Sequence, residues 1–128
     1  MKILIIGGNR FVGKLVTKHL YEDGNDVWVL NRTGTSPVEC GVLKCDRNDS
    51  DKLKQVIGDS YFDCVVDMCL YNLKQAKIST EVLKNKTDKY IFISSVAAYQ
   101  SSNIWPKSET HMLGGMDVFG NYGVDKTL

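Results

Sequence analysis

The stretch Ile3-Leu-Ile-Ile-Gly7-Gly8-Asn-Arg-Phe-Val-Gly13 decides the fold, because it predicts an apolar strand that runs into a glycine-marked turn. Gly7 allows the chain to turn tightly, and Gly13 lets a following helix approach the strand closely. A helix is expected up to Gly24, because apolar residues recur at helical spacing at Val12, Leu15, Val16 and Leu20. The N–H groups at the start of such a helix, helped by its dipole, can hold a pyrophosphate.

Short strand-like runs alternate with helical periodicity along the rest of the chain. Strands are expected at 2–6, 27–30, 41–44, 63–68 and 90–93, and further helices at 46–57 and 72–85. The helix over 72–85 is expected to place on one face Leu73, Ala76, Thr80 and Leu83. This alternation predicts one α/β domain over residues 1–128, a Rossmann-like doubly wound parallel sheet with strand order 3-2-1-4-5.

Composition and charge are those of an ordinary globular protein, with 24% charged and 43% hydrophobic residues. The formal net charge of +1 gives no basic field for nucleic acid or for an anionic membrane. No apolar run approaches the roughly 20 residues that span a bilayer, and the first apolar stretch is too short for a signal peptide. We expect a cytoplasmic protein without nucleic-acid or membrane partners.

Four cysteines raise the question of a metal site or disulfides. Their two C-x4-C spacings are wider than the C-x2-C of zinc sites, and Cys64 lies within an apolar run. Buried reduced thiols are therefore expected at Cys40, Cys45, Cys64 and Cys69.

Two other interpretations of the glycine turn remain open. From Gly8 the sequence also reads Gly-x-x-x-x-Gly-Lys, the phosphate-binding loop of nucleotide triphosphatases, with Asp67 as a metal-binding acid after a later strand. Leu15 argues against this interpretation, because the Ser or Thr hydroxyl that binds magnesium should follow Lys14. The remaining alternative is a glycine turn that binds nothing.

The residues after the second strand bear on the choice of cofactor. An Asp or Glu about 20 residues after the glycine turn would bind the adenosine ribose hydroxyls and select NAD. This sequence has Asn31-Arg32-Thr33 there. A guanidinium suits a 2′-phosphate, so Arg32 and Arg10 would form a two-sided clamp that favours NADP over NAD. An arginine that meets only solvent is the alternative.

Ser95, Tyr122 and Lys126 form a candidate catalytic set. Tyrosine, with a reference pKa of about 10, is a poor base at neutral pH, and an ammonium one helical turn away favours the phenolate. Tyr122 would then abstract or return a hydroxyl proton, while Ser95, delivered by the fifth strand, would hydrogen-bond the same substrate oxygen.

These motifs together resemble the extended branch of the short-chain dehydrogenase/reductase superfamily, the NAD(P)-dependent epimerases and dehydratases that act on nucleotide sugars. The segments that carry the resemblance are Gly7–Gly13, Cys45–Asp49, Asp63–Asp67, Phe92–Tyr99, Ser108–Thr110 and Tyr122–Lys126. Arg10 replaces the middle glycine of the family's Gly-x-x-Gly-x-x-Gly pattern. This variant is similar to a subgroup that includes the chloroplast stem-loop-binding proteins.

The resemblance implies roles for individual residues. Asp46, with Arg47 beside it, would lie at the adenine ring, and Lys126 would also bind the nicotinamide ribose. Met68 and Cys69 would line the cofactor's path past the fourth strand, and Tyr99 would lie near the substrate sugar. Cofactor-binding residues are further implied after the second strand, at Asn31 and Arg32, and in the turn, at Gly7, Gly8, Asn9, Arg10, Phe11, Val12 and Gly13.

The resemblance also implies hydride exchange between NADP, or NAD, and the sugar of a nucleotide-sugar substrate, with Tyr122 handling the hydroxyl proton. Members of this branch continue past the position of Lys126 into further strands and a substrate-binding subdomain. The 128-residue chain is therefore expected to be a truncated cofactor-binding half with little or no turnover, and a homo-oligomer is among its expected states. A noncatalytic NADPH-sensing or RNA-binding module is the alternative.

Overall fold

The computed structural model describes residues 1–127, apart from the side chain of Asp117. The chain forms two compact units, and each is described by itself. The sheet unit comprises Met1–Leu70 and Gln75–Ile93, and the C-terminal unit comprises Tyr71–Lys74 together with the chain from Ser94 onward.

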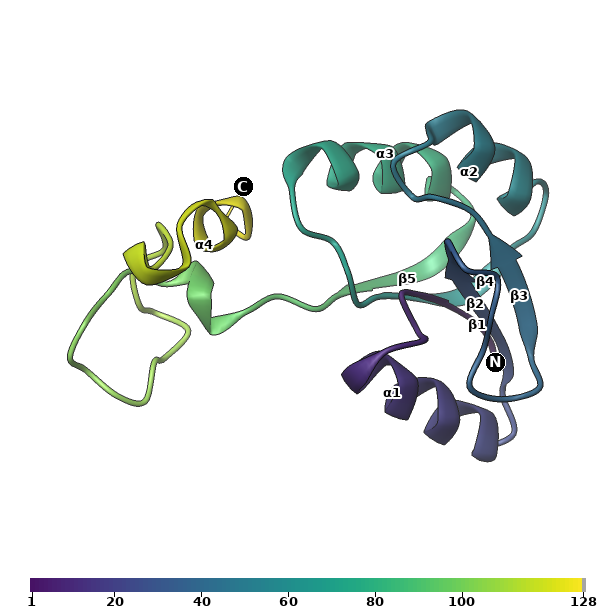
Figure 1. Cartoon of the computed structure of the whole chain (residues 1–128), viewed down its shortest axis with the longest axis horizontal. Coiled ribbons are helices and arrows are strands. Elements are labelled where there is room, and N and C mark those ends of the chain that lie inside the picture. Colours follow the sequence, from purple (N-terminus) through teal and green to yellow (C-terminus); the bar gives the residue numbers. More distant parts are fainter. Residues whose placement is uncertain (128) are drawn as a thin grey trace. The chain divides into compact units, whose positions relative to one another are not determined.

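The sheet unit contains a five-stranded, all-parallel sheet of order β3-β2-β1-β4-β5 (Figure 1). This order confirms the prediction, and the strand bounds differ from the expected ones by up to three residues. The strands are β1 (Lys2–Ile6), β2 (Asp26–Asn31), β3 (Gly41–Lys44), β4 (Phe62–Asp67) and β5 (Thr87–Phe92).

Helices cover both faces of the sheet, as a doubly wound fold requires. Helix α1 (Phe11–Glu22) lies on one face, and α2 (Ser50–Ile57) and α3 (Leu73–Leu83) cover the other (Figure 1). Asp49 caps α2 by accepting a hydrogen bond from the backbone N–H of Lys52, so this helix begins later than the expected residue 46.

The apolar core is split between these two faces because successive strand residues point in opposite directions. On the α2 and α3 face, Leu4 and Ile6 pack with Cys45. On the α1 face, Ile3 and Ile5 pack with Cys64. Each fully buried Leu or Ile contributes roughly 1.5–3 kcal/mol relative to an exposed one. Apolar packing on both faces therefore stabilises the sheet and, with it, the positions of the residues at the ends of its strands.

The buried face of α3 corrects the prediction from apolar spacing. The expected face of Leu73, Ala76, Thr80 and Leu83 is wrong, since Leu73 and Thr80 are exposed. The residues that α3 buries are Gln75, Ser79, Val82 and Leu83. Two of them are polar and are held by hydrogen bonds in the interior, which a rule based on apolar residues misses.

Helix α1 buries only part of the expected apolar set. Val12 and Leu15 are exposed, whereas Gly13 and Thr17 are buried and Val16 and Leu20 are partly buried. The Thr17 Oγ1 lies 2.8 Å from the carbonyl oxygen of Gly8 and 2.8 Å from that of Gly13, and its hydroxyl donates a hydrogen bond to them. The contact with Gly8 holds the Thr17 side of α1 against the glycine turn.

The C-terminal unit is built from short helical turns and loops. It contains η1 (Val96–Ala98), η2 (Asp117–Phe119) and α4 (Asn121–Asp125). The loop between them returns to η1, since Gly115 and Met116 donate backbone hydrogen bonds to Ala98 and Ala97. A Cβ on Gly123 would lie 2.4 Å from the carbonyl oxygen of Ala97, so α4 can pack here only with a glycine.

Among residues 1–127, no helix is both long and apolar enough to cross a membrane.

Candidate functional site

The turn between β1 and α1 is built around glycines that close packing requires. A Cβ on Gly7 would lie 2.8 Å from the Sγ of Cys69, and one on Gly13 would lie 2.5 Å from the carbonyl oxygen of Gly7. Gly7 has a φ of +84° and donates its N–H to the carbonyl of Leu30 in β2. The turn is therefore pressed against the ends of both neighbouring strands, β2 and β4.

The start of α1 is suited to an anion. The first N–H groups of a helix lack partners within it, and within the described part of the chain no side chain caps this end at Arg10. Phe11 has a φ of +46°, which is uncommon for a residue other than glycine, and its side chain is 89% exposed. Such local strain is often found at binding sites. At the predicted pyrophosphate position, the helix end is thus not capped by a described side chain, and its first residue has a strained backbone.

The loop after β2 is fixed by the side chain of Asn31. Its Oδ1 accepts hydrogen bonds from Thr33 Oγ1 and the N–H of Gly34, and its Nδ2 donates to the carbonyl of Thr35 at 2.7 Å. Asn9, in the glycine turn, donates to Thr35 Oγ1 at 2.7 Å. Asn31 and Asn9 were predicted as cofactor-binding residues, and their amide groups here hold the loop beside the turn.

Arg32 and Asp46 lie near each other at the ends of β2 and β3. Both side chains are exposed. Hydrogen bonds from the backbone and side chain of Asn48 lower the pKa of Asp46, and the charge of Arg32 lowers it further. The structure therefore presents a guanidinium and a carboxylate at the predicted adenosine position.

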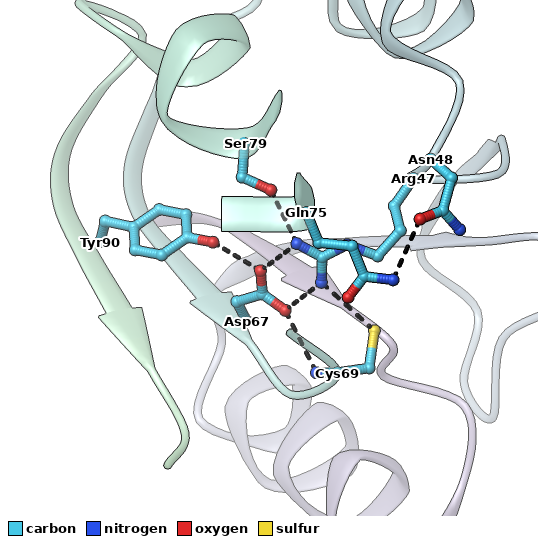
Figure 2. A network of polar contacts seen from close by, with 7 residues as sticks. All are labelled: Arg47, Asn48, Asp67, Cys69, Gln75, Ser79 and Tyr90. Atoms are coloured by element: carbon cyan, nitrogen blue, oxygen red, sulfur yellow. Dashed lines mark hydrogen bonds and ion pairs between the residues drawn. The ribbon is translucent and has the colours of Figure 1, made fainter. Parts of the chain in front are cut away.

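The side chain of Arg47 is buried, which the sequence did not suggest. Predicted beside Asp46 at the adenine ring, it is only 7% exposed, and its guanidinium points inward to Asp67 (Figure 2). Burial lowers the pKa of Arg47, but the hydrogen bonds and charge of Asp67 outweigh burial and raise it. A carboxylate buried at the end of β4 needs a cation, and among the described residues Arg47 supplies it.

Sequence reasoning missed this interior network. Asp67 is fully buried, and its partners besides Arg47 include the hydroxyl of Tyr90 and the backbone N–H of Cys69. A carboxylate with these contacts is not an exposed metal ligand, which argues against the triphosphatase interpretation. The available signal was an Asp inside an otherwise apolar strand, because an unpaired buried charge is costly.

None of the four cysteines forms a disulfide among the described residues. Cys45 and Cys64 are buried, as expected, whereas Cys40 and Cys69 are only partly buried. Met68 continues β4 by donating its backbone N–H to Ile6, and Cys69 follows beside Gly7. The predicted residues of the cofactor's path, Met68 and Cys69, therefore lie at the glycine turn.

The C-terminal unit contains a pocket of about 490 Å³. It brings together three predicted site residues, Ser95, Tyr99 and Lys126. Ser95 Oγ accepts a hydrogen bond from the N–H of Ala97, a contact that does not use its hydroxyl hydrogen. The described residues that line the pocket are Ser94, Ser95, Val96, Ala98, Tyr99, Leu113, Lys126 and Thr127.

Tyr122 stands outside this lining but lies against Lys126. The Lys126 ammonium is 5.6 Å from the ring centre of Tyr122 and 5.3 Å from that of Tyr71, within the range of a cation–π contact. The two tyrosine rings are 6.4 Å apart. No sequence motif identified Tyr71. It precedes α3 in the chain, and only folding brings its ring against Lys126.

The sheet order, the glycine turn and the helix that follows it define a Rossmann-like domain, the class of fold that binds dinucleotides at the carboxyl ends of its strands. The model of the NAD dependent epimerase/dehydratase family matches residues 3–128, and the chain belongs to this family.

Individual relatives agree with this assignment. The chain is 31% identical over 125 residues to the chloroplast stem-loop binding protein of 41 kDa b of Arabidopsis thaliana, covering 84% of this chain and 32% of that protein. It is 24% identical to the UDP-glucose 4-epimerase of Lactobacillus helveticus, covering 94% of this chain and 43% of that protein. The chain thus spans less than half the length of these curated relatives.

Solved structures show the same fold. A UDP-glucose 4-epimerase superposes with a TM-score of 0.84 at 23% identity, covering 99% of this chain and 44% of that one. The UDP-glucose 4-epimerase of Bifidobacterium longum, solved with NAD+ and UDP, gives a TM-score of 0.81 at 19% identity, covering 99% and 46%.

Proposed function

We propose that this chain is the dinucleotide-binding half of an enzyme that exchanges a hydride with a nucleotide sugar, as an epimerase, dehydratase or reductase. The observation that carries the proposal is the pocket that Ser95 and Lys126 both line, with Tyr122 against the Lys126 ammonium. Family membership and the closely packed glycine turn support the cofactor half of the proposal. The nucleotide-sugar substrate is suggested by the names of the relatives.

The residues of the C-terminal unit would perform the proton chemistry. Tyr122, whose ring lies against the Lys126 ammonium, would exchange a proton with the substrate hydroxyl. Ser95 donates a hydrogen bond to the same oxygen and stabilises charge that develops on it. Tyr99, whose ring meets His111 edge-on, lines the pocket where the sugar would lie. A nicotinamide cofactor, when bound, would supply the hydride acceptor.

The sheet unit would hold that cofactor. The start of α1 would bind the pyrophosphate, and Asp46 and Arg32 would flank the adenosine. The finer proposal is a preference for NADP, because Arg32 is exposed after β2 and no carboxylate stands at the position of Asn31. We place the activity in a polypeptide as long as the relatives. We expect the 128-residue chain alone to bind dinucleotide without turnover.

The test is to titrate the chain with NADPH and NADH and then to assay it with nucleotide sugars. Saturable enhancement of the cofactor fluorescence is expected without conversion of the sugar. Absence of binding to either cofactor would overturn the proposal, and robust turnover would overturn the expectation of inactivity. An RNA-binding role is less favoured, because the net charge of +1 offers no basic surface field.

A further inference from the structure

A buried ion pair ties the loop after β3 to the end of β4. The Nη1 of Arg47 lies 2.6 Å from Oδ1 of Asp67, and its Nη2 lies 2.7 Å from Oδ2, a two-pronged contact (Figure 2). The side chains are 8% and 0% exposed, respectively. The two residues are twenty positions apart in the sequence and belong to different strand ends.

The pair is also held from α3 and β5. Ser79 Oγ in α3 accepts a hydrogen bond from Arg47 Nη2 at 2.7 Å, and the hydroxyl of Tyr90 in β5 donates to Asp67 (Figure 2). Gln75 in α3 donates to Asn48, the residue after Arg47, at 3.1 Å. The loop after β3 is therefore anchored through two neighbouring residues.

Both ends of this network reach the proposed dinucleotide site. On one side, Asn48 holds the carboxylate of Asp46 at the adenosine position. On the other, Asp67 accepts the backbone N–H of Cys69 at 3.1 Å, and the guanidinium of Arg47 donates to Cys69 Sγ. That Sγ fills the space where Gly7 would carry a Cβ. One ion pair thus connects the adenosine position with the glycine turn and the segment after β4.

Stability alone gives a poor reason for such a pair. Two charges lose their hydration when they are buried, and apolar residues of similar volume are often as stable or more stable in the same place. The Nε of Arg47 is also buried and has no hydrogen-bond partner among the described residues, which adds to the cost. What a charged, two-pronged contact adds is a fixed geometry.

We propose that Arg47 and Asp67 form a positioning pair for the dinucleotide, which fixes the loop after β3 and the segment after β4 relative to the glycine turn. Neither residue touches the cofactor. The proposal rests on the proposed function, since it needs a bound dinucleotide. It goes further because it gives the pair a role in binding. The pair aligns the adenosine position, the glycine turn and the segment after β4, which one dinucleotide must occupy at the same time.

The test compares the wild-type chain with the double variant Arg47→Met, Asp67→Leu, which leaves no unpaired buried charge. The affinities of NADPH, NADH and ADP are measured by fluorescence or calorimetry, together with thermal unfolding. ADP reaches the adenosine and pyrophosphate positions but not the segment after β4. We expect a melting temperature at or above that of the wild type, an affinity for the better dinucleotide reduced about tenfold, and a clearly smaller loss for ADP.

Two single variants keep the test decisive if the double variant does not fold. Arg47→Lys retains the charge but loses the two-pronged contact, and it is expected to weaken dinucleotide binding more than ADP binding. Tyr90→Phe leaves the contact in place, and its dinucleotide affinity is expected to stay within about twofold of the wild-type value.

The outcomes separate this proposal from the proposed function. If the wild type binds no dinucleotide, the proposed function and the positioning pair are both overturned. If the wild type binds and the folded variants bind equally well, or lose dinucleotide and ADP affinity in equal measure, only the positioning pair falls.

Discussion

Cys69 occupies the space beside Gly7 in which any other residue would place its side chain, since a Cβ on Gly7 would lie 2.8 Å from the cysteine Sγ. Gly7 also has a φ of +84°, in the left-handed region. Two separate effects thus require glycine at this position: the backbone conformation and the neighbouring thiol.

Replacement of Gly7 by alanine is expected to reveal both effects. The left-handed backbone costs an L-residue about 1–2 kcal/mol, and the contact with Cys69 adds to the loss in the free energy of unfolding. Measured by urea denaturation, Gly7→Ala should be more destabilising in the wild type than in a Cys69→Ala background. An equal loss in both backgrounds would contradict a role for the thiol.

Replacement of Arg32 by alanine tests the choice of cofactor. If its guanidinium binds the 2′-phosphate, Arg32→Ala should weaken NADPH binding by at least about tenfold, the loss of one charge-assisted hydrogen bond, and leave NADH nearly unchanged. Fluorescence titration of both cofactors gives the comparison, and Lys18→Ala, an exchange on the body of α1, serves as a matched loss of charge. Equal affinities of the wild type for NADPH and NADH would contradict the proposed clamp of Arg32 and Arg10 on the 2′-phosphate.

Alkaline pH should destabilise the sheet unit. Burial raises the pKa of the Cys45 and Cys64 thiols above the ordinary 9.0. Burial, followed by the charge of Asp67, raises that of Tyr90 above 10.0. A raised pKa in the folded state favours the neutral form, so its contribution to stability is complete below the unfolded-state pKa. That contribution is lost as the pH rises toward the folded-state value.

The free energy of unfolding should therefore fall as the pH rises above about 9, by up to about 1.4 kcal/mol per pH unit for each group. Urea denaturation followed by circular dichroism at a series of pH values measures this slope. Cys64→Ala and Tyr90→Phe should each make the slope shallower, and an unchanged slope in both would show that other groups cause it.

Gly123 gives a test of the C-terminal unit. Alanine normally stabilises a helix by about 1 kcal/mol relative to glycine, but here its Cβ would collide with the carbonyl oxygen of Ala97. Gly123→Ala should therefore loosen α4, seen as faster hydrogen exchange at residues 121–127. Asn121→Ala, an exposed position in the same helix, serves as the control and should leave exchange unchanged or slower. Slower exchange in Gly123→Ala would show that α4 does not pack on η1.

The sequence predicted the topology because strand-like runs and the glycine turn are local signals, and the rule of right-handed crossovers leaves few arrangements of a parallel sheet. It failed at buried polar contacts. Apolar spacing cannot show that α3 turns Gln75 and Ser79 inward, because their partners, Asn48 and Arg47, lie about thirty residues away in the chain. The same limit explains why the inward orientation of the Arg47 side chain was not expected.

The site residues show the same contrast between local motifs, which the sequence reveals, and contacts that only the fold creates. Motifs predicted a catalytic set of Ser95, Tyr122 and Lys126, with Tyr99 near the substrate. In the structure Ser95, Tyr99 and Lys126 line one pocket, whereas Tyr122 lies outside its lining and against Lys126. No local pattern identified Tyr71, whose ring meets Lys126 only through the fold. Asn31 was recognised by position, but its role in holding the loop through Thr35 depends on backbone geometry that a motif does not encode.

Cys45 and Cys64 lie on opposite faces of the sheet, one beneath α2 and α3 and the other beneath α1. Each half of the core thus contains one native thiol that is buried, with a partly buried thiol, Cys69 or Cys40, packed against it. The rates at which a thiol reagent modifies Cys45 and Cys64 would time the opening of the two layers separately, without an added dye or an engineered cysteine. A layer that opens first would show its thiol reacting while the other is still protected.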